Sequence, residues 1–334
     1  MRRGLVRRVR AGLTRSWRHS LPIGLTLLVV LGGALAVHGG MVTMPWSEGG
    51  CTVAVGGRTV SLDEEQAQHA ATIAAIAVRR GLPARAVTIA LATAYQESNL
   101  RNLDHGDRDS LGLFQQRPSQ GWGSQAQVRD PVHAATKFYD ALVRIDGYRN
   151  LAVTEAAQRV QRSAFPRAYA DHEADARVLA SALTGYSPAA LACTVPGGSY
   201  APQQPGASGL TPRAAAVRRS LEGVFGRQAL GGFAPGGVRT GHVSGSAHYD
   251  GRALDVFVRP AGDPTQNRKG WAIAQWAVAN APALAVTTVI YDDRIWTARR
   301  GNEGWRPYDA PERSGDPAVL RHLDHVHIDV AAGS

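Results

Sequence analysis

Lysine is nearly absent from this sequence of 334 residues, where it occurs only at positions 137 and 269 and arginine replaces it elsewhere. We interpret this preference as a GC-rich coding bias without functional meaning. Acidic side chains are absent from residues 1–20, which contain seven arginines. Without this tail, the formal net charge of +10 falls to about +3 for the rest of the chain. Such a balance excludes the basic surface typical of nucleic-acid-binding proteins.

Charged side chains are also absent from residues 21–42, which are apolar apart from Thr26 and His38. This length is near the lower limit for a helix that crosses a bilayer. The arginines before it predict a cytoplasmic tail at 1–20, a transmembrane signal anchor at 21–42 and an extracytoplasmic remainder. A cleaved signal peptide is the alternative, with a small-residue site at Ala34-Leu-Ala36, and the protein would then be secreted.

Cysteine is scarce, with one residue at position 51 and one at position 193. Each begins a Cys-Thr-Val triplet, and together they enclose residues 52–192. Because an even number of cysteines in an exported protein favours a disulfide, we expect Cys51 and Cys193 to be joined. Ser-Glu-Gly-Gly stands directly before Cys51 in place of an apolar lipobox, which argues against lipidation of that residue.

The remaining chain divides into three predicted parts: a domain at 51–193, a linker at 194–210 and a domain at 211–334. Residues 51–193 carry helical patterns and helix-capping signals, so we expect an all-helical domain. The linker is rich in proline, glycine, serine and glutamine. The last domain mixes both element types and is expected to be α+β. Its predicted elements are a helix at Trp271–Asn280 and strands at Ala253–Val258, Val286–Tyr291 and His325–Val330.

Two histidine-rich motifs in the last domain predict a metal site. The first is Ser246-x-His248-x-x-Gly251-x-Ala253-x-Asp255, and the second runs from His322 through Asp324 and His325 to His327. Two imidazoles, a carboxylate and an open position for water are the composition of a catalytic zinc site. Gly251 permits the tight turn that brings two ligands seven residues apart onto one ion.

These motifs resemble those of zinc D-alanyl-D-alanine carboxypeptidases and dipeptidases. The resemblance implies that His248, Asp255 and His327 bind Zn²⁺ and that Asp324 is the general base. It also implies that an upstream arginine stabilises the substrate carboxylate and the developing oxyanion, for which Arg239 is our candidate. Ser246 is predicted to bind substrate. Strand alternation places Asp324 opposite His327, so the base role requires Asp324 to lie where the strand begins or bulges.

Other polar residues near these motifs receive weaker expectations. His325 shares strand parity with His327, and we expect it to contact the oxyanion or to support a ligand. His242 has no place in the motif and is expected to be solvated. Asp250 and Asp329 are expected to be structural.

A second pair of segments lies in the first domain: Tyr95-Gln-Glu97-Ser98-Asn99, followed by Gly112-Leu-Phe-Gln115. These segments resemble those of soluble lytic transglycosylases and goose-type lysozymes. The resemblance implies a lysozyme-like domain in which Glu97 is the general acid/base, and in which Ser98, Gln115 and Tyr169 bind sugar. The sequence departs from the family at Phe114 and after Gln115. A glycan-binding role without cleavage and a purely structural role therefore remain open.

Together these patterns predict an exported, membrane-tethered hydrolase whose partner is peptidoglycan. The zinc domain would cut the stem peptide as a carboxypeptidase or endopeptidase, and the helical domain would bind or cut the glycan strand. The alternatives are a wall-binding or scaffold protein with two degenerate sites and a protein that sequesters metal.

Overall fold

The structure, a computed structural model, describes residues 49–163, 165 and 167–333. The predicted basic tail (1–20) and membrane segment (21–42) lie outside the described residues. Within the part of the chain that is described, no helix combines the length and apolarity needed to cross a bilayer. The prediction of a single-pass membrane protein is corrected accordingly, because no spanning helix supports it.

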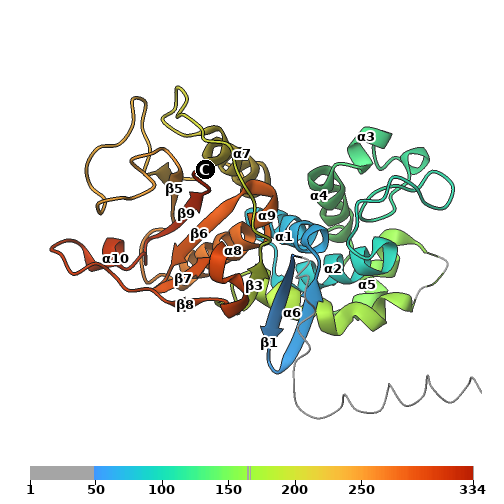
Figure 1. The fold of residues 1–334 in the computed structure, drawn as a ribbon. Helices are drawn as coiled ribbons and strands as arrows, with labels where there is room; N and C mark the ends of the chain where they lie inside the picture. The colour runs from blue at the N-terminus through green and yellow to red at the C-terminus, as the bar shows by residue number, and fades with distance from the viewer. Residues whose placement is uncertain (1–48, 164, 166, 334) are drawn as a thin grey trace, which may run out of the picture. The chain divides into compact units, whose positions relative to one another are not determined.

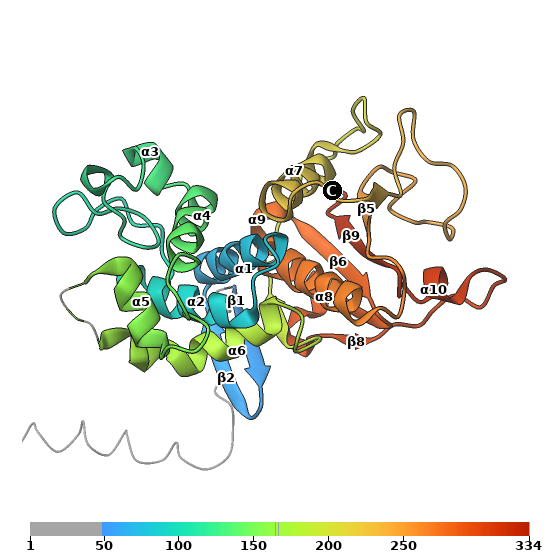
Figure 2. The same ribbon diagram turned by 180° about the vertical axis from the view of Figure 1, so that it is seen from behind.

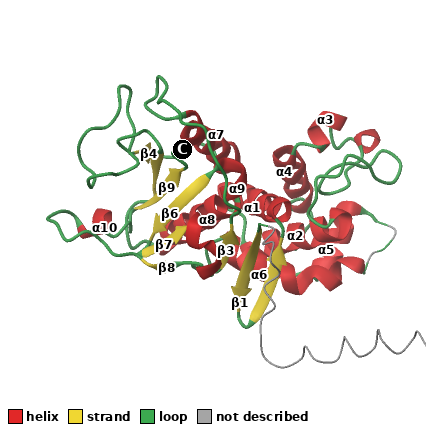
Figure 3. Cartoon of the chain, in the orientation of Figure 1, coloured by secondary structure: helices red, strands yellow, loops and turns green. Residues whose placement is uncertain are grey.

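The first half of the described chain contains both helices and a sheet, so the prediction of an all-helical domain is wrong (Figure 3). Three antiparallel strands form the sheet in the order β2-β1-β3. The elements are β1 (Gly50–Val55), β2 (Arg58–Leu62), α1 (Glu64–Arg79), α2 (Ala84–Ser98), α3 (Gln125–Val128), α4 (Pro131–Leu142), α5 (Val153–Gln161), α6 (Glu173–Leu183), β3 (Leu191–Thr194) and short 3-10 helices at Pro118–Gln120 and Ala168–His172.

The hairpin between β1 and β2 explains this error. Gly56 and Gly57 connect the two strands, and both have positive φ angles, of 58° and 80°. A two-residue turn of this kind is strongly favoured by paired glycines, because their backbone tolerates the left-handed region. The prediction of an all-helical domain overlooked this turn.

The second half contains a six-stranded antiparallel sheet in the order β4-β5-β9-β6-β7-β8 (Figure 1). Its elements are α7 (Pro212–Phe225), β4 (Leu230–Gly231), β5 (Ala253–Phe257), α8 (Pro264–Ala279), α9 (Ala281–Leu284), β6 (Val286–Tyr291), β7 (Arg294–Thr297), β8 (Arg306–Pro307), α10 (Pro317–Leu320), β9 (His325–Val330) and a 3-10 segment at Ala298–Glu303. Helix α8 packs on β6 and β9 (Figure 2) and buries Trp271 and Trp276. The three predicted strands and the helix between them are confirmed.

The described residues all belong to one compact unit. The side chain of Gln275 on α8 is fully buried and bonds to the backbone of the first half. Its amide oxygen accepts a hydrogen bond from Leu191 N at 2.8 Å, and its Nε2 donates to Ala182 O at 2.7 Å. Trp305 Nε1 donates to Leu191 O at 2.9 Å. Strand β3 is therefore held from both sides, by β1 and by the second half.

The predicted disulfide between Cys51 and Cys193 is confirmed and joins β1 to β3 where the two residues lie opposite each other.

Replacing both cysteines with alanine should lower the free energy of unfolding by roughly 2–5 kcal/mol, because the bond closes a long loop in the unfolded chain. Denaturant titration of the oxidised protein and the double variant measures this loss. Reduced wild-type protein is the control and should match the variant. Equal stability of all three samples would contradict the prediction.

Candidate metal centre

Two neighbouring strands place the carboxylate and one imidazole of the centre. Asp255 on β5 lies directly opposite His327 on β9 in the antiparallel register. Side chains of directly opposed residues project to the same face of a sheet, so the two groups meet there. Both are buried, with exposed fractions of 6% and 8%. The pairing requires the whole of both strands to be in register, which links the site to the fold.

The third group, His248, comes from the turn that precedes β5. His248 is 2% exposed. The turn ends at Gly251, whose φ is +65° and whose Cα lies so close to Gly209 O that a β-carbon would collide with it. The predicted tight turn at Gly251 is confirmed, and the turn directs the His248 ring back over the sheet.

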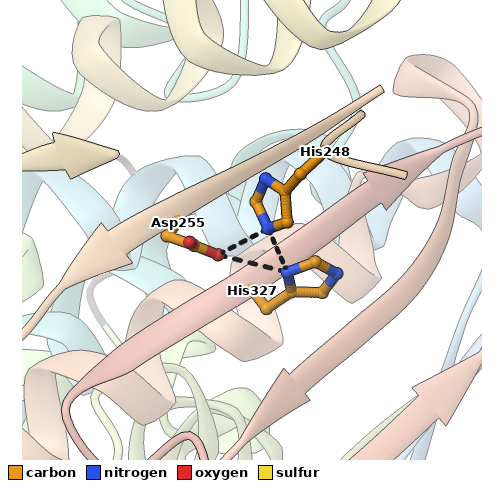
Figure 4. Close-up of side chains that lie close together, drawn as sticks. All are labelled: His248, Asp255 and His327. Atoms are coloured by element: carbon orange, nitrogen blue, oxygen red, sulfur yellow. Dashed lines mark hydrogen bonds and ion pairs between the residues drawn. The ribbon is translucent and has the colours of Figure 1, made fainter. Parts of the chain in front are cut away.

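The three side chains converge on one point (Figure 4). His248 Nε2 lies 3.0 Å from His327 Nδ1 and 3.2 Å from Asp255 Oδ1, and His327 Nδ1 lies 3.1 Å from the same oxygen. Ligands placed tetrahedrally about 2.0–2.1 Å from a zinc ion would be separated by roughly 3.3 Å. The observed spacing therefore fits a single metal ion, and this cluster can hold one.

The partners of the outer ring nitrogens support this interpretation. His248 Nδ1 lies 2.7 Å from Gly232 O, which can only accept, so Nδ1 carries the hydrogen. His327 Nε2 lies 2.8 Å from Asp329 Oδ1, which favours the hydrogen on Nε2. Neutral rings in these tautomers direct two lone pairs at each other across 3.0 Å. A cation between them removes that repulsion, and outer partners of this type are typical of histidine ligands.

The electrostatics of the cluster also favour a bound cation. Burial by itself would raise the pKa of Asp255, but His248 and His327, when protonated, supply hydrogen bonds and positive charge that outweigh burial and hold this pKa well below its usual range. For His327 the effects are opposite in sign. Burial lowers its pKa, but the charge of Asp329 and the contact with Asp255 raise the pKa by more. An ionised carboxylate in a buried site requires a positive partner, which can be a proton or a metal ion.

The cluster opens onto a cavity of about 450 Å³. His242 lies in its wall and stacks on His248, with ring centroids 3.9 Å apart. Burial, followed by the charge of His248, lowers the pKa of His242 to about 4. The expectation that His242 is simply solvated is therefore wrong. His322 also lines the cavity, and burial lowers its pKa to about 3.

Asp324 lies immediately before β9, as a base role requires, but its carboxylate does not line the cavity. One oxygen accepts a hydrogen bond of 2.6 Å from His325 Nδ1, and the other accepts one of 2.8 Å from Arg259 Nε. These bonds outweigh the effect of burial and lower the pKa of Asp324. His325 does line the cavity, and its Nε2 lies 3.8 Å from Asp255 Oδ1. Asp324 thus contacts the centre through His325.

The other residues predicted for this site differ in their positions. Ser246 lines the cavity, and its Oγ accepts a long hydrogen bond of 3.4 Å from His248 N. Arg239 is exposed and is not part of the cavity wall, so the structure does not bring it to the centre. The arginines that line the wall are Arg259 and Arg313. Neither was expected, because both lie outside the motifs.

The candidate glycan site lies in the first half, where α2 ends. Tyr169 OH donates a hydrogen bond of 2.7 Å to Glu97 Oε1. Burial raises the pKa of Glu97, and hydrogen bonds from Tyr169 and Gln161 reduce this effect. Ser98 Oγ donates to Leu113 O at 2.8 Å, which attaches the helix end to the next segment. Gln115 Nε2 bonds to the backbone carbonyls of Gly112 and His105.

Comparison with known proteins gives one partial match. The family model described as "VldE, C-terminal domain" matches residues 206–318, about a third of the chain. The matched region includes His248 and Asp255 but ends before Asp324 and His327. No curated protein matches the chain. Support for a metal centre therefore comes from the geometry of the three side chains.

Gly232 offers a test of the centre. Its φ is +77°, and a β-carbon would collide with the His248 ring and lie 2.8 Å from Asp255 Oδ2. We expect Gly232→Ala to weaken metal binding at least tenfold, because supporting contacts of metal ligands typically have effects of this size. Gly236→Ala is the matched control, since its φ is +79° and its β-carbon would meet nothing within 4 Å. Competition titration with a chromogenic chelator measures both affinities, and equal losses would refute the prediction.

Proposed function

We propose that this chain is a zinc-dependent peptidase that cleaves the stem peptides of peptidoglycan. The observation that carries the proposal is the convergence of two histidines and one aspartate at a cavity wall. Three protein ligands beside an accessible space are typical of catalytic zinc sites, whereas structural zinc sites have four. The two nitrogen donors and one oxygen donor suit zinc among the common metals.

The residues around the centre can supply the other parts of a hydrolysis. Zinc, when bound, acts as a Lewis acid and makes water a nucleophile at neutral pH. Because Asp324 is acceptor-only, His325 must donate through Nδ1, so a neutral His325 directs the lone pair of Nε2 toward the centre. His325 Nε2 can take a proton from the attacking water, and Asp324 stabilises the resulting imidazolium. Asp324, which was predicted to be the general base itself, would thus assist proton transfer through the ring of His325.

The peptidoglycan assignment depends on the motifs of both halves. The C-terminal motifs resemble those of D-alanyl-D-alanine peptidases, and the segments around Glu97 resemble those of lytic transglycosylases. A polymer with both peptide and sugar parts accounts for both resemblances in one chain. The disulfide agrees with an oxidising compartment, where such a polymer is found.

We further propose that the first half cleaves or binds the glycan strand. The supporting observation is the half-buried Glu97 with its hydrogen bond from Tyr169. Because burial raises its pKa, Glu97 stays protonated to a higher pH than an exposed glutamate and can donate a proton to a glycosidic oxygen. A non-catalytic wall-binding protein is the competing proposal and predicts binding without products.

Replacement of Asp324 with asparagine tests the peptidase proposal. We expect Asp324→Asn to reduce turnover of purified muropeptides by at least 100-fold, a typical contribution of acid–base catalysis. Bound zinc should be unchanged, because Asp324 is not one of the three converging groups. Product masses and elemental analysis give the two readouts. His248→Ala is the contrasting variant and should lose the metal itself. Unchanged turnover in Asp324→Asn would exclude its role.

A chelator tests the division of labour between the halves. Metal removal should abolish peptide cleavage and leave glycan cleavage intact, because Glu97 has no metal-like cluster around it in the described residues. Glu97→Gln should show the reverse pattern, with glycan cleavage lost and peptide cleavage intact. In the wild type, glycan cleavage should decline as the pH rises and the Glu97 carboxyl loses its proton. Mass spectrometry of digested sacculi separates the two product classes. Loss of both activities on chelation would contradict this division.

A further inference from the structure

Residues 201–211, which include the end of the predicted linker, pack against the second half of the chain; we call them the strap. Leu210 and Thr211 are both buried. Gly206 N donates a hydrogen bond of 2.8 Å to Leu210 O, and Gly209 N donates one of 2.9 Å to Gly206 O. The strap therefore forms a closed turn on the protein, whereas sequences rich in glycine and serine form flexible coils when they are not packed.

Gly209 lies between two backbone segments that position His248. On one side, a β-carbon on Gly209 would collide with the carbonyl of Ala234, which is in the loop that follows β4. On the other side, a β-carbon on Gly251 would collide with Gly209 O. Thr211 N also donates a hydrogen bond of 2.8 Å to Gly251 O. The backbone of the strap thus fills the space between the loop and the turn and sets their separation.

Both segments determine how the ring of His248 is oriented. The turn that ends at Gly251 carries the side chain, and the loop after β4 supplies Gly232 O, which lies 2.7 Å from His248 Nδ1. Ala234 is only two residues beyond Gly232 in that loop. A change in the distance between loop and turn would therefore strain the contact that holds the ring, and contacts of this kind tune metal affinity.

The strap also contacts the end of β9, which carries His327. Arg213, in the first turn of α7, donates a hydrogen bond of 2.6 Å from Nη2 to Ala201 O and one of 3.1 Å from Nη1 to Ala331 O. Its backbone N donates to Gln203 Oε1 at 3.0 Å. Ala331 directly follows β9. The strap is thus connected to every segment that carries His248 or His327 or orients the ring of His248.

We propose that Gly209 is a positioning residue of the metal centre, and that the seated strap sets the affinity of the centre for its ion. The proposal rests on the metal ion of the proposed function and not on its peptide substrate. Only glycine suits this position, because its φ is +82° and the neighbouring backbone leaves no room for a β-carbon. A side chain there displaces the loop or the turn and tilts His248 away from Asp255 and His327.

The experiment compares the full chain as wild type, Gly209→Ala and Gly206→Ala. Gly206 is the matched control in the same turn, because its φ lies outside the left-handed region and its β-carbon would make an ordinary contact of 3.7 Å with Leu210 O. Competition with a chromogenic chelator gives the Kd for Zn²⁺, and the visible spectrum of the Co²⁺-loaded protein reports ligand geometry. Hydrogen exchange of residues 246–252 and denaturant unfolding are measured on metal-free protein.

We expect Gly209→Ala to bind Zn²⁺ at least tenfold more weakly than wild type, as for the loss of other supporting contacts of metal ligands. Its Co²⁺ bands should shift, and residues 246–252 should exchange faster, because the turn loses its support. Gly206→Ala should match wild type in all three measurements. A Gly209→Ala variant that unfolds more easily but keeps the Kd and the Co²⁺ spectrum of wild type would overturn the proposal, since its role would then be merely structural.

If Gly209→Ala does not fold, Arg213→Gln takes its place and removes the side-chain bonds to Ala201 O and Ala331 O. Arg219→Gln is its control, because Arg219 is an exposed arginine on the same helix. Arg213→Gln should bind Zn²⁺ more weakly than Arg219→Gln, and equal affinities would overturn the proposal. If wild type binds neither metal, the proposed function fails, and hydrogen exchange of residues 246–252 alone decides whether the strap positions the turn.

Discussion

The antiparallel register between β5 and β9 is the constraint on which the centre depends. It sets Asp255 opposite His327, and it places His325, His327 and Asp329 on one face of β9. A slip of one residue would move the side chains of one strand to the opposite face of the sheet and separate the carboxylate from the imidazole. Buried apolar residues of both strands, including Leu254, Val256, Val326 and Ile328, pack on the opposite side and oppose such a slip. The core therefore enforces the geometry of the site.

The centre is rigid on the protein side and open toward the cavity. Gly232 O, Asp329 and the turn at Gly251 restrain the ligands from behind, so their orientation depends on backbone as much as on side chains. Side chains fixed in this way lose little conformational freedom when an ion binds, which favours a preformed site. The opposite side is lined by His242, His322 and His325. A centre of this kind can bind an ion firmly and still expose it to a substrate.

The sequence predicted the ligands better than it predicted the surrounding structure. His248, Asp255 and His327 could be recognised because they occupy two short motifs that resemble those of a known peptidase family, and a motif is a local feature of the sequence. The sheet of the first half was missed because β3 pairs with β1 across a separation of 142 residues, and each strand is too short for a clear periodic signal. The choice of Arg239 failed to identify a residue of the cavity, since loop conformation depends on contacts that spacing does not encode. The alternation of His325, His327 and Asp329 was visible, and it could have identified Asp329 as a ligand's partner.

The distribution of charge around the cavity favours one orientation of a polar ligand. Asp324 and Arg259 neutralise each other on one side, so that side contributes His325 and little net charge. Asp255 and Asp329 make the innermost part negative until a cation binds there. Arg313 leaves the mouth positive. Because opposite charges at the two ends of a cavity of about 450 Å³ are screened less than on an open surface, they favour one orientation of a polar ligand over its reverse. This polarity therefore has two origins: the register of β5 and β9 places the carboxylates, and a loop contact to Gly241 O places Arg313.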